Sequence, residues 1–145
     1  MAYEFKPIVF DHDPTEQEIF KAAVVHLVRQ RVPSITGGEC RYRMQDQDTG
    51  KTLACAVGAF YPESIEAVEG LVVRECLELF GDKLPSWMLE RKSLLILLQY
   101  CHDEAALGSG GYLSSLKRGL TNVARDVGIV EQQFDALWYD ALVKD

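Results

Sequence analysis

Two cysteines lie within the stretch of the chain that is richest in residue types able to do chemistry, "CRYRMQDQDTGKTLACAVGAFYP" at residues 40–62. A thiolate is both a nucleophile and a metal ligand, so Cys40 and Cys55 raise the question of a zinc site or a nucleophilic centre. The same stretch has the pattern of a β-hairpin, because two strand-like segments flank the polar turn "QDQDTG". The register of that hairpin decides which chemistry is available.

Two registers are compatible with the turn. A turn symmetric about its centre places Cys40 opposite Cys55, close enough to share a metal or to be oxidised together. A three-residue loop of residues 48–50, with Gly50 left-handed, places Cys55 opposite Arg43 and separates the two cysteines. We favour the second register, because Gly50 lies where that loop needs a positive φ.

A zinc site needs two further ligands, which Cys76, Cys101 or His102 could supply. The chain contains no C-x-x-C or H-x-x-x-H spacing, and on a helix the adjacent residues Cys101 and His102 point about 100° apart. A Cys-His-Asp centre is disfavoured as well, because neighbours such as His102 and Asp103 cannot orient one another on a helix as a triad does. We therefore expect buried structural cysteines, with no metal, no cofactor and no catalytic residue.

The composition is that of a cytoplasmic globular protein. The 145 residues are 48% hydrophobic and 26% charged, which is typical of a chain with a substantial core. No apolar run is long enough to cross a bilayer, and the first residues lack the pattern of a signal peptide. We expect a single domain over residues 1–145, without a membrane segment.

The net charge of −7, from 15 basic and 22 acidic residues, opposes nonspecific binding to nucleic acid. We therefore do not expect a nucleic-acid partner, although one group of basic residues stands out locally. This group consists of Arg29, Arg31, Arg41, Arg43 and Lys51. The acidic residues are scattered rather than in runs, which disfavours a mimic of DNA.

Helical periodicity dominates the rest of the chain. Thr15 and Glu18 have the spacing of a capping box and predict a first helix over residues 15–32. Strands are expected at residues 40–44 and 51–57, a short turn at 64–69, and further helices at 71–80, 86–107, 112–127 and 130–142. The predicted fold is α+β and mainly α, with about five amphipathic helices and one antiparallel β-hairpin inserted at about residues 40–57.

The segment "GSGG" at residues 108–111 precedes one of these helices. Backbone N–H groups at such a helix start can bind a phosphate. The segment lacks the lysine and the serine or threonine of a P-loop and does not follow a strand, so a flexible connector is favoured.

Several short motifs occur along the chain in a recognisable order: C-x-Y-R at residues 40–43, "CAVG" at 55–58, "PE" at 62–63, "EG" at 69–70 and "LQYCHD" at 98–103. Together they resemble a family of small bacteriophage and prophage proteins whose members typically carry C-x-Y-R, C-A-[IV]-G-C-L-I-P-D, E-G and L-Q-x-x-H-D. The likeness covers roughly residues 16–130. This chain departs from the pattern at Ala59, where the family has a cysteine, and at Glu63, where it has an aspartate. The missing cysteine weakens the zinc and redox interpretations. The resemblance implies that the chain is encoded by a phage or prophage, and it implies no mechanism.

The favoured function is a non-enzymatic binding protein of phage origin that interferes with a host process such as a defence system. It would occlude a host protein or sequester a nucleotide-like signal. The expected ligand-binding residues are polar residues of the motifs and basic residues near them: Arg41, Tyr42, Arg43, Lys51, Glu69, His102 and Asp103. Phosphate groups would lie on Arg41, Arg43, Lys51 and the "GSGG" helix start. The same polar residues could instead form a buried hydrogen-bond network that fixes the hairpin against the long helix.

A homodimer or larger assembly is expected, with the helix at residues 130–142 as its surface through Phe134, Leu137 and Trp138. The alternative function is a small metal- or cysteine-dependent hydrolase that uses Cys40, Cys55 and His102. A depressed thiol pKa would distinguish the hydrolase from the binding protein.

Overall fold

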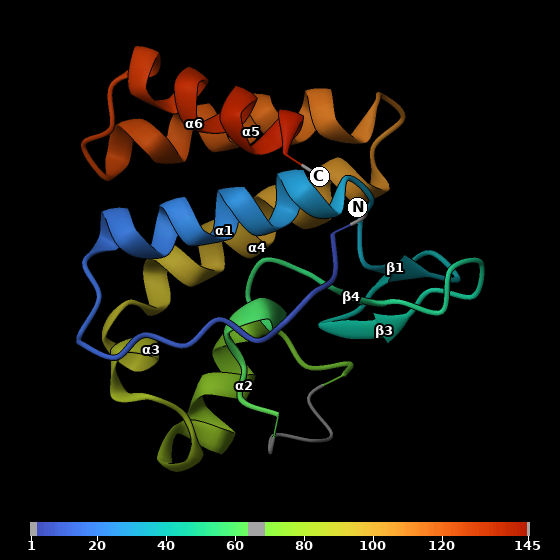
Figure 1. Ribbon diagram of the computed structural model, residues 1–145. Coiled ribbons are helices and arrows are strands. Elements are labelled where there is room, and N and C mark those ends of the chain that lie inside the picture. Colours follow the sequence, from blue (N-terminus) through green and yellow to red (C-terminus); the bar gives the residue numbers. More distant parts are fainter. Residues whose placement is uncertain (1–2, 64–68, 145) are drawn as a thin grey trace.

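The computed structural model describes residues 3–63 and 69–144 (Figure 1). Over these residues it contains six α-helices and two small antiparallel strand pairs, which confirms the predicted α+β, mainly α fold. The helices are α1 (Glu16–Gln30), α2 (Val73–Phe80), α3 (Ser86–Glu90), α4 (Lys92–Leu107), α5 (Tyr112–Asp126) and α6 (Glu131–Val143), with short 3-10 turns at Gly58–Phe60 and Gly81–Lys83. In the described part of the chain, no helix has both the length and the apolarity that crossing a membrane requires.

The helices are stacked in layers (Figure 1). α5 and α6 run side by side across one end of the molecule, α1 and α4 lie beneath them, and α2, α3 and the strands lie on the far side of α1 and α4. The hydrophobic core contains buried residues from all six helices of the described chain.

α1 begins as its capping box predicts. The N–H of Glu18 donates to the Thr15 hydroxyl at 3.1 Å, and the N–H of Thr15 donates to the Glu18 carboxylate at 3.0 Å. The helix ends at Gln30, two residues before the predicted end, because Arg31 adopts the left-handed conformation with φ of 67°. A left-handed residue at this position is a common way to end a helix.

Two short strand pairs replace the single predicted hairpin. β1 (Ile35–Thr36) pairs with β2 (Glu39–Cys40), and β3 (Arg43–Gln45) pairs with β4 (Thr52–Ala54). The predicted strand bounds of 40–44 and 51–57 are therefore wrong. Gly37 and Gly38 both have positive φ and turn the chain between β1 and β2, which places Cys40 in a different hairpin from Cys55.

Neither predicted register is observed. Cys55 lies opposite Tyr42, to whose carbonyl its N–H donates at 3.1 Å, and not opposite Arg43 or Cys40. Cys40 pairs with Ile35 instead. The two cysteines are therefore separated, as the favoured register implied, but for a different reason.

The turn between β3 and β4 explains the shift in register. The N–H of residue 46 donates to the carbonyl of residue 51 at 2.7 Å, so that residues 47–50 form a loop one residue longer than predicted. Gly50 does have the left-handed conformation that was expected, with φ of 73°. Because each added residue shifts the pairing by one, this single loop residue changes every partner.

The helix predicted at residues 86–107 is divided into α3 and α4 at Arg91, whose φ of −109° and ψ of 25° are not helical. The break lets Trp87 pack against Phe10 and Phe60, with ring centroids 5.5 and 5.3 Å apart, while α4 follows its own direction. The helix predicted at 71–80 begins two residues later, and the turn predicted at 64–69 lies largely outside the described residues.

The predicted dimer surface on α6 is wrong. Phe134 and Trp138 are buried in the core, and the Phe134 ring lies 5.8 Å from that of Phe20 on α1. Leu137 is partly buried against the same core. These side chains pack α6 onto its own chain, because α1 presents a matching apolar face.

Candidate functional site

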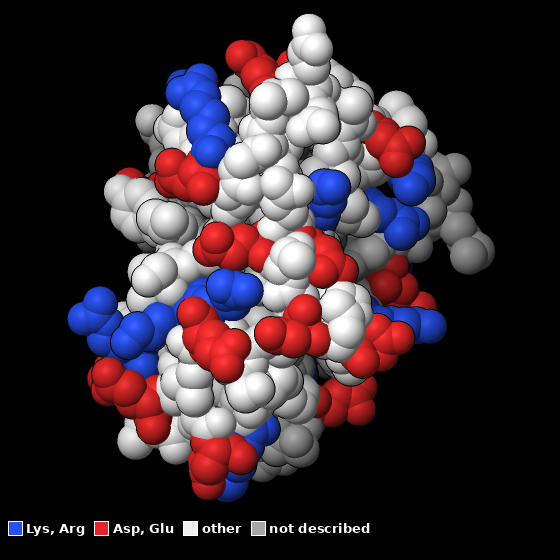
Figure 2. Space-filling model, turned by 90° about the vertical axis from the view of Figure 1, so that its left-hand side faces the viewer, with Lys and Arg blue, Asp and Glu red and all other residues white. Residues whose placement is uncertain are grey.

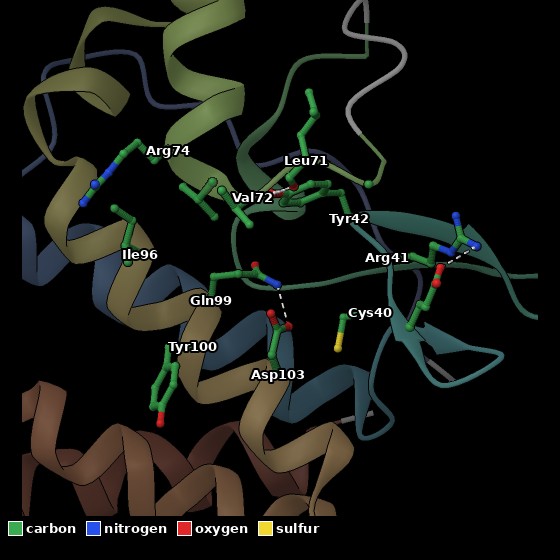
Figure 3. Close-up of a pocket in the computed structure, with 13 residues that line it drawn as sticks. Cys40, Arg41, Tyr42, Leu71, Val72, Arg74, Ile96, Gln99, Tyr100 and Asp103 are labelled. Carbon is green, nitrogen blue, oxygen red and sulfur yellow. Dashed lines mark hydrogen bonds and ion pairs between the residues drawn. The ribbon is translucent and has the colours of Figure 1, made fainter.

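A pocket of about 640 Å³ opens between three segments of the chain (Figure 3). Residues 39–42 form one wall, and residues 70–74 at the start of α2 form another. The third wall is one face of α4, where Ile96, Gln99, Tyr100 and Asp103 follow the spacing that places residues on the same side of a helix. Three of the expected site residues, Arg41, Tyr42 and Asp103, line this pocket.

Tyr42 and Glu69 hold two of the walls together. The backbone N–H groups of Tyr42 and Arg43 donate to the two oxygens of the Glu69 carboxylate at 2.9 and 3.1 Å. The Tyr42 hydroxyl donates to the carbonyl of Leu71 at 2.5 Å. Burial raises the pKa of Tyr42, so the hydroxyl keeps its proton and remains a donor.

Arg43 does not face the pocket. Its Nε donates to the carbonyl of Gly58 at 3.0 Å, its terminal nitrogen donates to the carbonyl of Tyr61, and the guanidinium lies 5.2 Å from the Phe5 ring. The guanidinium is therefore engaged in holding the backbone that follows β4.

Gly58 allows a close approach of two backbone segments. A Cβ atom at this position would lie 2.0 Å from the carbonyl oxygen of Tyr42. A glycine is needed here because there is no room for a side chain.

His102 and Asp103 form a hydrogen-bonded pair on α4, in which Asp103 lines the pocket and His102 is buried. The N–H of Ser34 donates to His102 Nε2 at 3.1 Å, so Nδ1 carries the proton and donates to the Asp103 carboxylate at 2.8 Å. Gln99 donates to the same carboxylate oxygen at 2.8 Å. The prediction that neighbouring His102 and Asp103 cannot orient one another is wrong, because Nδ1 lies near the helix backbone and within reach of the next carboxylate.

Three possible metal ligands meet in this network. Ligand atoms of Cys40, His102 and Asp103 all lie within 4.8 Å of one another, and Figure 3 shows Cys40 and Asp103 facing the same space. A metal on Nδ1 would require the proton to move to Nε2, where the N–H of Ser34 already points. The donor set therefore does not fit a metal ion.

The thiols are poorly suited to nucleophilic chemistry. Burial, with a further contribution from the Asp103 carboxylate, raises the pKa of Cys40 to about 12. Burial also raises the pKa of Cys55 to about 12 and that of Cys101 to about 11. A nucleophilic cysteine needs the opposite shift, because the thiolate is the reactive form.

The remaining expected residues lie elsewhere. Lys51 is in the turn between β3 and β4 and lines a different pocket. Arg41 reaches the first pocket, but its guanidinium turns toward Glu39, with an N···O distance of 3.5 Å (Figure 3). The "GSGG" segment ends at the start of α5 and lines neither pocket. The expected single phosphate site is thus divided among separate parts of the molecule.

Sequence reasoning missed several residues that line the pocket, among them Val72, Arg74, Ile96, Gln99 and Tyr100. The spacing of Ile96, Gln99, Tyr100 and Asp103 was a usable signal, since it places a mixed polar and apolar face on one helix. Nothing in the local pattern of Val72 and Arg74 indicates a site, because only the packing of α2 against α4 brings them there.

No protein family, curated protein or solved structure matches this chain.

Proposed function

We propose that the protein is a non-enzymatic binding protein that holds a nucleotide-like small molecule in the pocket beside α4. As a phage or prophage product, which the motif resemblance implies, it would interfere with a host process such as a defence system by sequestering that molecule. The observation that carries the proposal is the combination of apolar walls with the Asp103 carboxylate on the α4 wall of the same pocket.

The size and lining of the pocket suit a planar organic ligand. Its volume of about 640 Å³ lies within the range of sites that bury small organic ligands. Leu71, Val72 and Ile96 supply apolar surface beside the Tyr42 ring. A flat, partly apolar group such as a nucleobase gains by leaving water in such a place.

Asp103 supplies the polar end of the pocket. Its hydrogen bonds from Gln99 and His102 both end on Oδ1, and its side chain is 36% exposed. The carboxylate also interacts with the Cys40 thiol, and its exposed surface in the pocket can accept a hydrogen bond from the amino group of a nucleobase. The Arg74 side chain on the opposite wall supplies a cation for a phosphate group (Figure 3).

The charge on the surface fits a small ligand better than a nucleic-acid partner. Figure 2 shows acidic and basic side chains interspersed over one face of the molecule, without a broad area of positive charge on that face. Duplex recognition relies on such an area, because phosphate contacts supply most of the affinity.

The test measures, by calorimetry, the binding of a panel of linear and cyclic nucleotides to the full chain. Val72 lines the pocket yet is 62% exposed, so Val72→Arg should block the pocket without unfolding the protein. Leu79→Arg is the matched control, since Leu79 is 64% exposed on α2, the helix whose N-cap is Val72, and lies outside the lining. We expect the wild type and Leu79→Arg to bind a member of the panel and Val72→Arg to lose it.

A panel in which no nucleotide binds would contradict the proposal and favour the second candidate, occlusion of a host protein. One observation supports that candidate: α4 exposes two apolar side chains outside the pocket. They are Leu97 and Leu107, which are 42% and 56% exposed. Equal binding by Val72→Arg and the wild type would also contradict the proposal, by placing the ligand elsewhere.

A further inference from the structure

We infer that a second pocket, at the end of α1, binds the diphosphate group of a small molecule. The pocket has a volume of about 540 Å³ and shares no lining residue with the pocket beside α4. Its walls come from the end of α1, the turn between β3 and β4, and the two ends of the described chain at Tyr3 and Lys144. Figure 1 shows the two chain ends close to the end of α1.

The lining of this pocket has the opposite charge balance to the whole protein. Four of its residues are basic and one is acidic: Arg29, Arg31, Lys51 and Lys144 against Asp46. The chain as a whole has 15 basic and 22 acidic residues. Like charges gathered in a pocket repel one another, so the arrangement is suited to an anion that offsets the repulsion.

Local structure accounts for only part of this group. The negative end of the α1 dipole favours Arg29 in the last turn, and Lys144 forms an ion pair with Asp140 at 3.2 Å. Arg31 and Lys51 form no ion pair with a carboxylate of the described residues. Asp46, the acidic residue of the lining, accepts a hydrogen bond from the Thr49 hydroxyl at 2.7 Å and pairs with neither cation.

The backbone conformation of Arg31 is a second, independent observation in favour of an anion site. It is the one residue other than glycine with positive φ in the described chain. Glycine would take this conformation without steric cost. One terminal nitrogen of Arg31 donates to the carbonyl of Leu142 at 2.5 Å, but a guanidinium has five N–H donors, and this bond uses one nitrogen. An arginine at a position suited to glycine places a cation at the pocket.

The ligand class follows from these groups. Arginine binds phosphate oxygens in pairs, and lysine binds them as a point charge. Arg31 and Lys51 belong to different walls, one after α1 and one in the β3–β4 turn, so they can engage two linked phosphates together. The Tyr3 ring lies 4.9 Å from the Arg29 guanidinium and adds an aromatic wall for an organic group attached to them.

The test is calorimetric titration of the full chain with inorganic pyrophosphate at low ionic strength, where charge interactions are least screened. Arg31→Gly removes the guanidinium while suiting the backbone conformation, and Lys51→Gln removes the second cation from the turn. We expect saturable binding to the wild type and about tenfold weaker binding in each variant, the effect of losing one strong charged contact. Arg118→Ala, which removes an exposed cation outside the pocket, should bind as the wild type does.

Absence of saturable pyrophosphate binding to the wild type, or unchanged binding in both variants, would overturn the inference. If Arg31→Gly fails to fold, Lys51→Gln decides the question alone. A parallel titration with adenosine diphosphate distinguishes the source of the ligand: tighter binding than pyrophosphate indicates a nucleotide, and equal binding indicates the free diphosphate. Val72→Arg should retain pyrophosphate binding, so this inference and the proposed function can fail separately.

Discussion

The polar residues of the C-x-Y-R motif act mainly on the backbone. Arg43 donates to two carbonyl groups after β4, and Glu69 accepts from two N–H groups at the start of β3. This arrangement is close to the buried hydrogen-bond network that the sequence left open as an alternative. Tyr42, Gln99 and Asp103 combine a place in such a network with a place in the pocket lining.

Replacing Arg43 by alanine should destabilise the fold, rather than remove a ligand contact from an intact protein as the sequence suggested. The carbonyl groups of Gly58 and Tyr61 would lose charged donors, at a cost of about 3 kcal/mol in the free energy of unfolding. Arg43→Lys should restore little of this loss, because one amine cannot reproduce the fork of a guanidinium. Urea denaturation measures the effect, with Arg41→Ala as control. Equal stability of Arg43→Ala and Arg41→Ala would show that the guanidinium bonds are unimportant.

At the scale of elements, α1 packs against β4, and two side chains of α1 form hydrogen bonds with the backbone of one β4 residue, Ala54. Gln30 accepts from the N–H of Ala54 and donates to its carbonyl, both at 3.0 Å. His26 Nε2 donates to the same carbonyl at 2.9 Å, so Nδ1 accepts from the Tyr3 hydroxyl at 2.8 Å. The helix thereby satisfies backbone groups of β4 that have no strand beside them.

This contact should make stability depend on pH. Burial lowers the pKa of His26 to about 4, while in the unfolded chain its pKa is near 6.5. Because the unfolded state takes up the proton at higher pH, the stabilisation is complete above about pH 6.5 and is lost as the pH falls toward 4. The loss amounts to roughly 3 kcal/mol.

Urea denaturation between pH 7 and pH 4 measures this effect, and His26→Gln is the control. The variant removes the titrating group but leaves the exposed carboxylates, whose own contribution is then subtracted. An identical pH dependence in the variant and the wild type would refute the assignment to His26.

At the scale of the whole molecule, α6 is part of the core. Phe134 and Trp138 pack together, with ring centroids 6.1 Å apart, and Phe134 also contacts Phe20 on α1. The residues left exposed on α6 are others, among them Tyr139 at 55%. An assembly of several copies remains a prediction, and it would need a surface other than the one on α6 that was expected.

Trp138→Ala should therefore lower stability without changing the oligomeric state. Removing a buried indole leaves a cavity and costs about 3 to 5 kcal/mol. Tyr139→Ala, at the neighbouring exposed position, should cost much less. Urea denaturation together with light scattering after size exclusion measures both properties. A Trp138→Ala protein of unchanged stability that dissociates into smaller units would restore the original interpretation of α6.

Much of the local structure could be predicted from the chain, because its signals lie within a few residues of one another. The capping box of Thr15 and Glu18, the left-handed Gly50 and the apolar periodicity of α5 and α6 are examples. The break at Arg91 was missed, because it depends on the contact of Trp87 with distant aromatic rings. The sequence predicted only some of the residues that line the pocket, because the packing of distant segments brings the others there.

The sequence by itself determined the α+β class, the main helices and the absence of a metal-binding spacing, since periodicity, caps and ligand spacing are local properties. The tertiary structure decided the strand register, the pairing of His102 with Asp103 and the inward orientation of α6. It also decided that Arg43 binds backbone carbonyls, while Arg31 and Lys51 meet at a separate pocket. These outcomes depend on the packing of segments far apart in the chain, and for the strand register a single added loop residue was enough to change the outcome.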